Sequence, residues 1–253
     1  MRIAILLAWF YLIGLLGVYA APVSITTQME LDNYLATLTD NTIPASDTVT
    51  ISGVGIDIIV DIVNEGIINI SNTIELKPGV LFTNNGTLNI ASGTFEMEGS
   101  STLINNRILL IDDSTFDMED AGNIFNNYGT ITTDNNISGS IYGTFNNFGT
   151  LTMNHPSDDL EILATGILNN CGSISGNPTA EIQNDNIINT NEPITSIIIS
   201  NNPPIINASI CPRPAPVPTI EQWGIIILSL LMLIFGAIAL NQRKVTRLGS
   251  CKS

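Results

Sequence analysis

The chain has 253 residues, of which 12% are charged, and its formal net charge at pH 7 is −15. All 23 acids lie between an apolar run near the N-terminus and another near the C-terminus, together with three of the eight bases, so this central part carries 3 − 23 = −20. A surface this acidic repels phosphate backbones, which excludes nucleic acid as a partner. The three central bases are Lys77, Arg107 and Arg213.

Residues 1–20 have the pattern of a secretory signal peptide. Arg2 supplies a positive charge, residues 3–18 are apolar and uncharged, and the small-residue sequence "VYA" ends at Ala20. The alternative is a membrane helix that is not cleaved. With cleavage between Ala20 and Ala21, the mature chain is exported.

Residues 21–46 are predicted to hold an amphipathic helix. Thr27 and Glu30 have the spacing of a capping box, in which each side chain bonds the backbone N–H of the other. Four apolar residues then share one helical face. We expect this helix to cover the first turn of the next domain, because an open end of a repeat fold invites edge-to-edge aggregation. The four residues are Leu31, Tyr34, Leu35 and Leu38.

An internal repeat fills residues 47–210. Asparagine pairs recur in similar surroundings, as in "LFTNNGTLNI" and "TFNNFGTLTM", at steps of 21, 21, 20 and 23 residues. A degenerate copy, "IVNEGIINI", precedes them and decayed copies follow. Such periodicity is the sequence signature of a solenoid, in which each repeat packs on its neighbours. The pairs begin at Asn84, Asn105, Asn126, Asn146 and Asn169.

Apolar residues alternate with polar ones inside each repeat, as at Leu88 and Ile90 or Leu151 and Met153, which predicts short strands. The Leu-x-x-Leu-x-Leu pattern of leucine-rich repeats is absent, and Gly and Asn are placed where tight corners need them. We therefore predict a mainly β fold, a parallel β-helix of about seven or eight coils with two or three strands each. Equivalent asparagines would form ladders at its corners. A β-sandwich is the runner-up fold.

The repeat shows no catalytic constellation. Lyases and hydrolases built on β-helices combine carboxylates with basic residues, whereas His155, which precedes Pro156, is the one histidine of the chain. We interpret the acids as a solvated surface, with weak Ca²⁺ binding left open. No enzyme activity, no cofactor and no tuned metal site are predicted. The acids considered are Asp112, Asp113, Glu119, Asp120, Asp158, Asp159 and Glu161.

Residues 211–218 form a Pro-rich linker, which is stiff and extended. Residues 225–240 carry no charge and are predicted to form a transmembrane helix, with Trp223 as an interfacial anchor. Basic stop-transfer residues follow and leave residues 248–253 in the cytoplasm. A soluble core helix is the alternative, but the run has no amphipathic stripe. The stop-transfer residues are Arg243, Lys244 and Arg247.

Two of the three cysteines, Cys171 and Cys211, lie on the exported side in this topology, where a disulfide between them is permitted. The sequence leaves open whether they pair. Cys251 falls in the reducing cytoplasm.

The segment "VPTIEQWG", followed by the apolar run and the basic end, resembles the IPTL-CTERM sorting signal of exported bacterial proteins. That pattern is Ile-Pro-Thr-Leu, two variable residues, Trp-Gly, a transmembrane helix and a short Arg-rich tail. Here two aliphatic positions are conservatively replaced and the basic end is more dilute. The sorting signal spans residues 217–247 and says nothing about the repeat. Its motif consists of Val217, Pro218, Thr219, Ile220, Trp223 and Gly224.

The resemblance implies that a membrane-embedded exosortase in the inner membrane of a Gram-negative bacterium recognises the motif, cleaves near it, and releases or transfers the ectodomain to the cell surface. We expect the ectodomain to be a non-enzymatic structural or adhesive rod with a surface or matrix ligand that the sequence does not identify. One alternative is a lyase or glycoside hydrolase acting on polysaccharides. Another is a periplasmic protein that stays anchored in the membrane.

Overall fold

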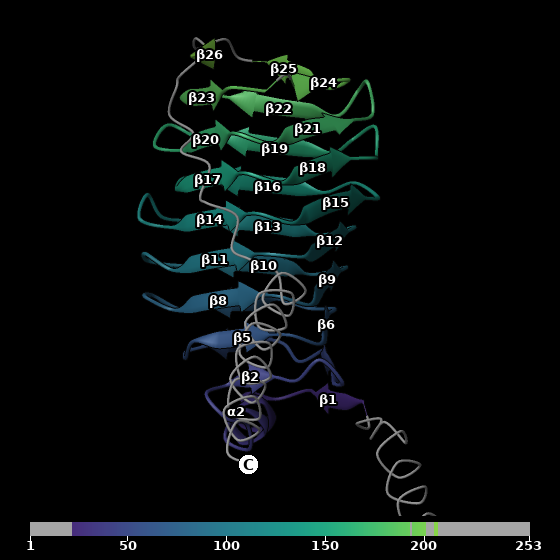
Figure 1. Cartoon of the computed structure of the whole chain (residues 1–253), viewed down its shortest axis with the longest axis vertical. Coiled ribbons are helices and arrows are strands. Elements are labelled where there is room, and N and C mark those ends of the chain that lie inside the picture. The colour runs from purple at the N-terminus through teal and green to yellow at the C-terminus, as the bar shows by residue number, and fades with distance from the viewer. Residues whose placement is uncertain (1–21, 193, 201–204, 207–253) are drawn as a thin grey trace, which may run out of the picture. The chain divides into compact units, whose positions relative to one another are not determined.

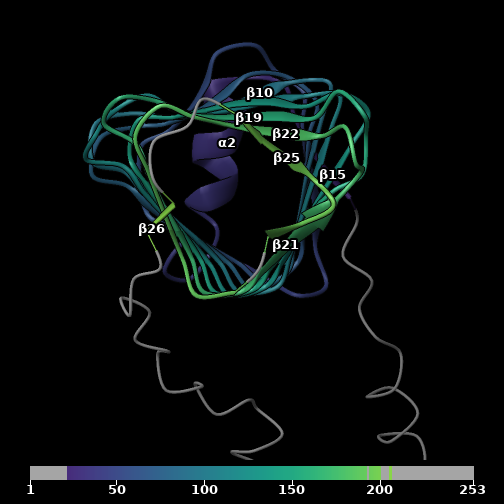
Figure 2. The same ribbon diagram turned by 90° about the horizontal axis from the view of Figure 1, so that it is seen from above.

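The computed structural model describes residues 22–192, 194–200 and 205–206. Three parallel β-sheets wind around one core, and each turn of the chain adds a strand to every sheet (Figure 1). Viewed along the axis, the sheets form the sides of a triangle (Figure 2). The fold is a parallel β-solenoid of about eight turns, which confirms the predicted β-helix. Because neighbouring strands pair in parallel, the β-sandwich was wrong.

The three sheets are named A, B and C. Sheet A contains β1 (Val23–Ile25), β3 (Thr48–Ile51), β6 (Ile67–Ile70), β9 (Thr87–Ala91), β12 (Ile108–Asp112), β15 (Thr130–Asp134), β18 (Thr150–Met153), β21 (Ser173–Gly176) and β24 (Ile194–Thr195). Sheet B contains β2 (Thr42–Ile43), β5 (Ile62–Asn64), β8 (Leu81–Asn84), β11 (Thr102–Asn105), β14 (Ile124–Asn127), β17 (Thr144–Asn147), β20 (Ile167–Asn170), β23 (Ile187–Thr190) and β26 (Ile205–Ile206). Sheet C contains β4 (Ile56–Ile58), β7 (Ile74–Leu76), β10 (Thr94–Met97), β13 (Thr115–Met118), β16 (Ser138–Ile141), β19 (Asp159–Ile162), β22 (Glu181–Asn184) and β25 (Ile198–Ser200).

The core is a column of aliphatic and phenylalanine side chains that point inward from all three sheets. Alternate residues are buried in most of the strands, as predicted for Leu88 and Ile90. Aromatic rings stack from one turn to the next, with the ring centroids of Phe125 and Phe145 4.7 Å apart. Such pairs contribute about 0.5–1.5 kcal/mol beyond the area that they bury.

The asparagine pairs do not all align first member to first member on neighbouring turns, and this corrects the predicted alignment. Asn84 pairs with Asn105, and both are first members of their pairs. Asn105, however, pairs with Asn127, the second member of the next pair. The buried asparagines of successive turns are therefore separated by 21, 22, 20 and 23 residues. The inward-facing Phe125 decides the phase, because side chains alternate between the two faces of a strand and Asn127 lies two residues after it.

Backbones of successive turns approach closely at the corner between sheets B and A. A Cβ on Gly86 would overlap the carbonyl oxygen of Gly66, and a Cβ on Gly149 would overlap that of Gly129. Glycine is the residue that permits such an approach. This explains why glycine recurs just after the asparagine pairs.

The helix α2 (Gln28–Leu35) forms in the stretch where an amphipathic helix was predicted. Its capping box is present, with Glu30 N donating to Thr27 Oγ1 at 3.3 Å and Thr27 N donating to Glu30 Oε2 at 3.2 Å. Leu31 and Leu35 are buried in the core cluster, and α2 lies within the triangle of sheets at the N-terminal end (Figures 1 and 2). The strand β1 precedes this helix and already belongs to sheet A, so the solenoid begins before residue 47.

The predicted signal peptide, the whole of the predicted Pro-rich linker and the whole sorting signal lie outside the described residues. So does the predicted transmembrane helix at 225–240. Among the residues that the structure describes, no helix has the length and apolar character to span a membrane.

Candidate functional site

A ladder of buried asparagines runs along the inner side of sheet B. In the first five members, each Nδ2 donates to the Oδ1 of the asparagine one turn later at 2.7–2.8 Å. The same Nδ2 also donates to a backbone carbonyl of that later turn at 2.7–3.2 Å. These bonds confirm the predicted ladder, and an orphaned buried amide would cost about 1–3 kcal/mol. The members are Asn64, Asn84, Asn105, Asn127, Asn147 and Asn170.

A second asparagine ladder lies on the outer side of sheet B and runs in the opposite direction. Asn146 Nδ2 donates to Asn126 Oδ1 at 2.8 Å, Asn169 donates to Asn146 at 2.7 Å, and Asn189 donates to Asn169 at 2.7 Å. In this ladder each donor belongs to the later turn. Both ladders use amide groups to bind one turn to the next, so these amides serve the scaffold.

The outer side of sheet C carries a column of carboxylates in register. Asp57, Glu75, Glu96 and Asp117 occupy equivalent positions on four successive strands. Like charges directly opposite one another on neighbouring strands are destabilising. The column could not be predicted from the sequence, because it depends on the register of the strands.

Lys77 neutralises one end of this acidic column. Its Nζ bonds the Glu75 carboxylate, and it lies 3.1 Å from Glu98 Oε2 and 3.6 Å from Asp57 Oδ1. The hydrogen bond to Glu75, followed by that to Glu98 and the charges of Asp57 and Glu75, raises the pKa of Lys77 despite partial burial. The ammonium group therefore stays charged at neutral pH.

Farther along the column the carboxylates are not neutralised in this way. Burial raises the pKa of Glu96, and the charges of neighbouring carboxylates raise it further. The pKa of Glu119, one turn later, is raised by the same two causes in the same order. Burial also raises the pKa of Asp117, although a hydrogen bond from Ser140 N at 3.0 Å opposes that rise.

The acids that the sequence analysis considered for catalysis are dispersed over the solenoid. Asp112 and Asp113 lie at the corner between sheets A and C, whereas Glu119 and Asp120 follow β13 at the corner between sheets C and B. Asp120 Oδ2 accepts a hydrogen bond from Gly99 N at 2.6 Å and so holds the turn before it. Within the described residues, no three His, Cys, Asp or Glu side chains are placed to hold a metal ion.

Asp158 is buried and organises the corner at which His155 lies. Its carboxylate accepts hydrogen bonds from the Thr133 hydroxyl at 2.6 Å, from Ile137 N at 3.1 Å and from His155 N at 2.9 Å. His155 joins this set through its backbone, while its Nδ1 accepts from Ser157 N at 3.3 Å. These contacts give Asp158 a structural role.

A polar groove of about 340 Å³ runs along the corner between sheets A and C. Four consecutive turns line it, with hydroxyl and amide groups and a single carboxylate, that of Asp113. We call it the corner groove. Its lining residues are Asn72, Thr73, Ser92, Gly93, Thr94, Asp113, Ser114, Thr115, Asn136 and Ser138.

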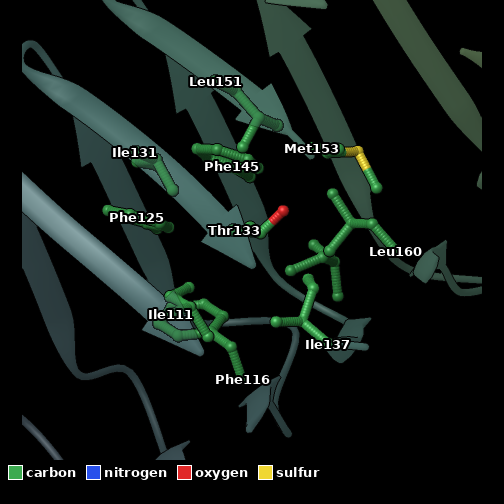
Figure 3. Close-up of a pocket in the computed structure, with 11 residues that line it drawn as sticks. Ile111, Phe116, Phe125, Ile131, Thr133, Ile137, Phe145, Leu151, Met153 and Leu160 are labelled. Carbon is green, nitrogen blue, oxygen red and sulfur yellow. The ribbon is translucent and has the colours of Figure 1, made fainter. Parts of the chain in front are cut away.

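A small cavity of about 30 Å³ lies inside the solenoid and is lined mainly by apolar side chains (Figure 3). Gly139 lies in register between Phe116 and Leu160, so one inward-pointing side chain is missing from that column. Thr133 also lines the cavity, and its hydroxyl donates a hydrogen bond to the Asp158 carboxylate. The cavity is a packing defect, because an apolar space of this size has too few polar partners to hold water.

Cys171 is part of a disulfide bond. It is the one cysteine among the described residues, so its pairing with Cys211 stays a prediction. The predicted cleavage site at Ala20 and Ala21, the sorting motif and the stop-transfer residues likewise lie outside the described part of the chain.

The fold defines the chain as a parallel β-solenoid protein. Residues 215–244 match the IPTL-CTERM motif, which confirms the resemblance found in the sequence. This match covers the predicted motif, the apolar run, Arg243 and Lys244, but not the solenoid. It points to an exported protein with a membrane-anchored C-terminal sorting signal for an exosortase. The comparisons found no match among curated proteins and none among solved structures.

Proposed function

We propose that the protein is a non-enzymatic surface rod of a Gram-negative bacterium, which an exosortase cleaves near Pro218 and Thr219 and delivers towards the cell surface. The observation that carries this proposal is the IPTL-CTERM motif at residues 215–244, which follows a signal-like N-terminus and a solenoid. The motif needs a partner enzyme in the inner membrane, and its Trp223 and Gly224 are the other residues that the enzyme would read.

The solenoid supports a structural or adhesive role. Its buried asparagines bind each turn to the next, and two of the acids considered for catalysis, Asp120 and Asp158, accept hydrogen bonds from the backbone. A rod of stacked turns presents long flat faces, which suits repeated weak contacts with a surface or matrix. The helix α2 would protect the first turn from pairing with another chain.

The test is the intact mass of the mature protein, in the native host with and without its exosortase. We expect the mature protein to lack residues 225–240 when the exosortase is present and to retain them when it is absent. A double change of Pro218→Ala and Trp223→Ala should retain the tail in both strains. The matched control, Val217→Ile with Ile220→Leu, restores the usual motif and should be processed as the wild type is.

An identical C-terminus containing residues 225–240 in both strains would contradict the sorting proposal and favour a protein that stays anchored in the membrane. The catalytic alternative is tested separately. Turnover of polygalacturonate or alginate by the purified chain, lost on Asp113→Asn or Asp112→Asn, would overturn the non-enzymatic assignment.

A further inference from the structure

We propose that the corner groove binds a neutral linear polysaccharide that lies parallel to the solenoid axis. This inference concerns the solenoid alone and does not depend on the sorting of the tail. It assigns a ligand class to a polar groove of about 340 Å³.

The floor of the corner groove is a row of hydroxyl groups, one from each turn. Thr94 pairs with Thr115, and Thr115 pairs with Ser138, in neighbouring strands of sheet C. Thr73 precedes Ile74, the partner of Phe95, and so continues the row by one turn. Adjacent parallel strands are about 4.8 Å apart, so the hydroxyls recur at about this interval. A pyranose ring is of similar length, and each sugar of a linear chain can therefore meet an equivalent hydroxyl.

Several polar groups of the groove are unused by the protein. The side chains of Ser92, Thr94, Asp113 and Asn136 make no hydrogen bond to any other described residue. By contrast, the buried Ser114 hydroxyl donates to the Asp112 carbonyl at 2.6 Å and accepts from Gly93 N at 3.2 Å. The hydroxyls of Thr115 and Ser138 share one hydrogen bond at 3.3 Å, which leaves one O–H of the two for a ligand. Hydroxyls and amides both donate and accept, as the hydroxyls of a sugar do. The free groups therefore match a polyhydroxylated ligand.

The corner between β15 and β16, at the C-terminal end of the groove, is one residue longer than the two corners before it. Two residues connect β9 to β10 and two connect β12 to β13, whereas the three residues 135–137 connect β15 to β16. Asn136 in this longer corner has a φ of 65° and is exposed. The longer corner places its amide group beside the hydroxyl row and turns a flat sheet edge into a trough.

The charge of the groove selects against acidic polymers. None of its ten lining residues is cationic, and the acidic column of Glu96 and Asp117 lies on the same sheet. A polyanion would meet repulsion along its whole length at moderate ionic strength. A neutral glycan meets none, and its hydroxyls can donate to Asp113.

The test is affinity electrophoresis of the full chain, purified in detergent, through gels that contain dextran, laminarin, hydroxyethylcellulose or galactomannan, with polygalacturonate as the anionic probe. We expect at least one neutral polymer to retard the wild type and polygalacturonate not to. The double variant Thr94→Val, Thr115→Val should bind that polymer about tenfold more weakly, because each lost hydrogen bond reduces affinity by a factor of a few.

Valine keeps the shape and strand preference of threonine, so the double variant should fold, and circular dichroism checks this. The matched control is Thr132→Val with Thr152→Val, paired threonines on the outer side of sheet A. Asp113→Asn should keep most of the binding, and Asp113→Leu should lose it. The proposal is overturned if no neutral polymer retards the protein, if only polygalacturonate does, or if the control pair weakens binding as much as the groove pair. Processing of the tail should be unchanged in all these variants, which separates this result from the sorting test.

Discussion

The side-chain amide of Asn105 donates to Oδ1 of Asn127 at 2.8 Å, although the first residue opens one asparagine pair and the second closes the next. The ladder of buried amides therefore continues although the buried residue changes from the first member of a pair to the second. The extra residue lies in the corner between sheets C and B, where five residues, 119–123, connect β13 to β14, whereas four, 98–101, connect β10 to β11. Tyr128 follows Asn127 in the register position of Asn106, and its ring stacks on Phe148 at a centroid distance of 4.9 Å. The turn absorbs an insertion at the corner without losing the buried bonds.

This change of phase makes a prediction that contrasts neighbouring residues. Asn105→Ala and Asn127→Ala should each lower the free energy of unfolding by about 2–4 kcal/mol, because each leaves a buried amide unpaired and a small cavity. Asn106→Ala and Asn126→Ala should cost less than about 1 kcal/mol, since those side chains lie nearer solvent. Urea unfolding followed by far-UV circular dichroism measures all four. Similar losses at Asn105 and Asn106 would contradict the described register.

Glu96 of the acidic column and Glu119, which follows β13 beside it, predict a pH dependence. Burial and neighbouring carboxylates raise the pKa of Glu96 and Glu119 in the folded state, so the folded chain takes up these protons at a higher pH than the unfolded chain does. Lowering the pH from neutral through the raised pKa values therefore increases the free energy of unfolding. The variant Glu96→Gln, Glu119→Gln should be more stable than the wild type near pH 7, by less than about 1 kcal/mol per residue.

The difference between this variant and the wild type should shrink as the pH approaches about 4, where the wild-type carboxyls are protonated. Urea midpoints at several pH values provide the measurement. The control is Glu65→Gln, which removes a negative charge from an exposed corner outside the column. A control that stabilises as strongly as the column variant would show that only net charge matters.

The helix α2 is predicted to protect the first turn of the solenoid. Leu31 is 1% exposed, and Leu31→Asp should detach the helix from the core while the sheets remain. We expect concentration-dependent association, because the edge strands of the first turn become available for pairing. Light scattering measures this, with circular dichroism as the check on β content. Met29→Asp adds the same charge at a position that is 71% exposed and should leave the protein dispersed.

The pairing of Cys171 is predicted to be with Cys211. Peptide mapping of the unprocessed full chain without reduction should then yield a linked pair of peptides containing both residues, while Cys251 reacts with an alkylating reagent. Cys171→Ser and Cys211→Ser should lower stability by equal amounts, about 2–4 kcal/mol for a loop of this length. A peptide that links Cys171 to Cys251 would refute the pairing.

The sequence was sufficient for the class of fold and for the start of α2. Alternation at Leu88 and Ile90, and the capping spacing of Thr27 and Glu30, are local patterns that need no knowledge of register. The sorting motif could also be predicted from the sequence, because its residues lie close together in the chain. These features follow from the sequence alone, and the motif match supports the last of them.

Other features depend on which residues face one another across turns. Glu75 and Glu96 are 21 positions apart, so their contact follows only from the strand pairing. The phase of the asparagine pairs was predicted wrongly, because both members of a pair are the same residue type and the side chain before them decides which one is buried. The corner groove was not foreseen, since four turns contribute to it and no short segment contains it.

The two asparagine ladders of sheet B have opposite polarity. The inner ladder passes its hydrogen bonds from earlier donor to later acceptor, whereas the outer ladder passes them from later donor to earlier acceptor. The amide dipoles of the two ladders therefore point in opposite directions along the axis and partly offset one another. The turns that carry both ladders offer the same kinds of donor and acceptor to the turn before and the turn after. A solenoid of this kind can be lengthened or shortened by whole turns, and its reach from a surface can change with no new chemistry at the junctions.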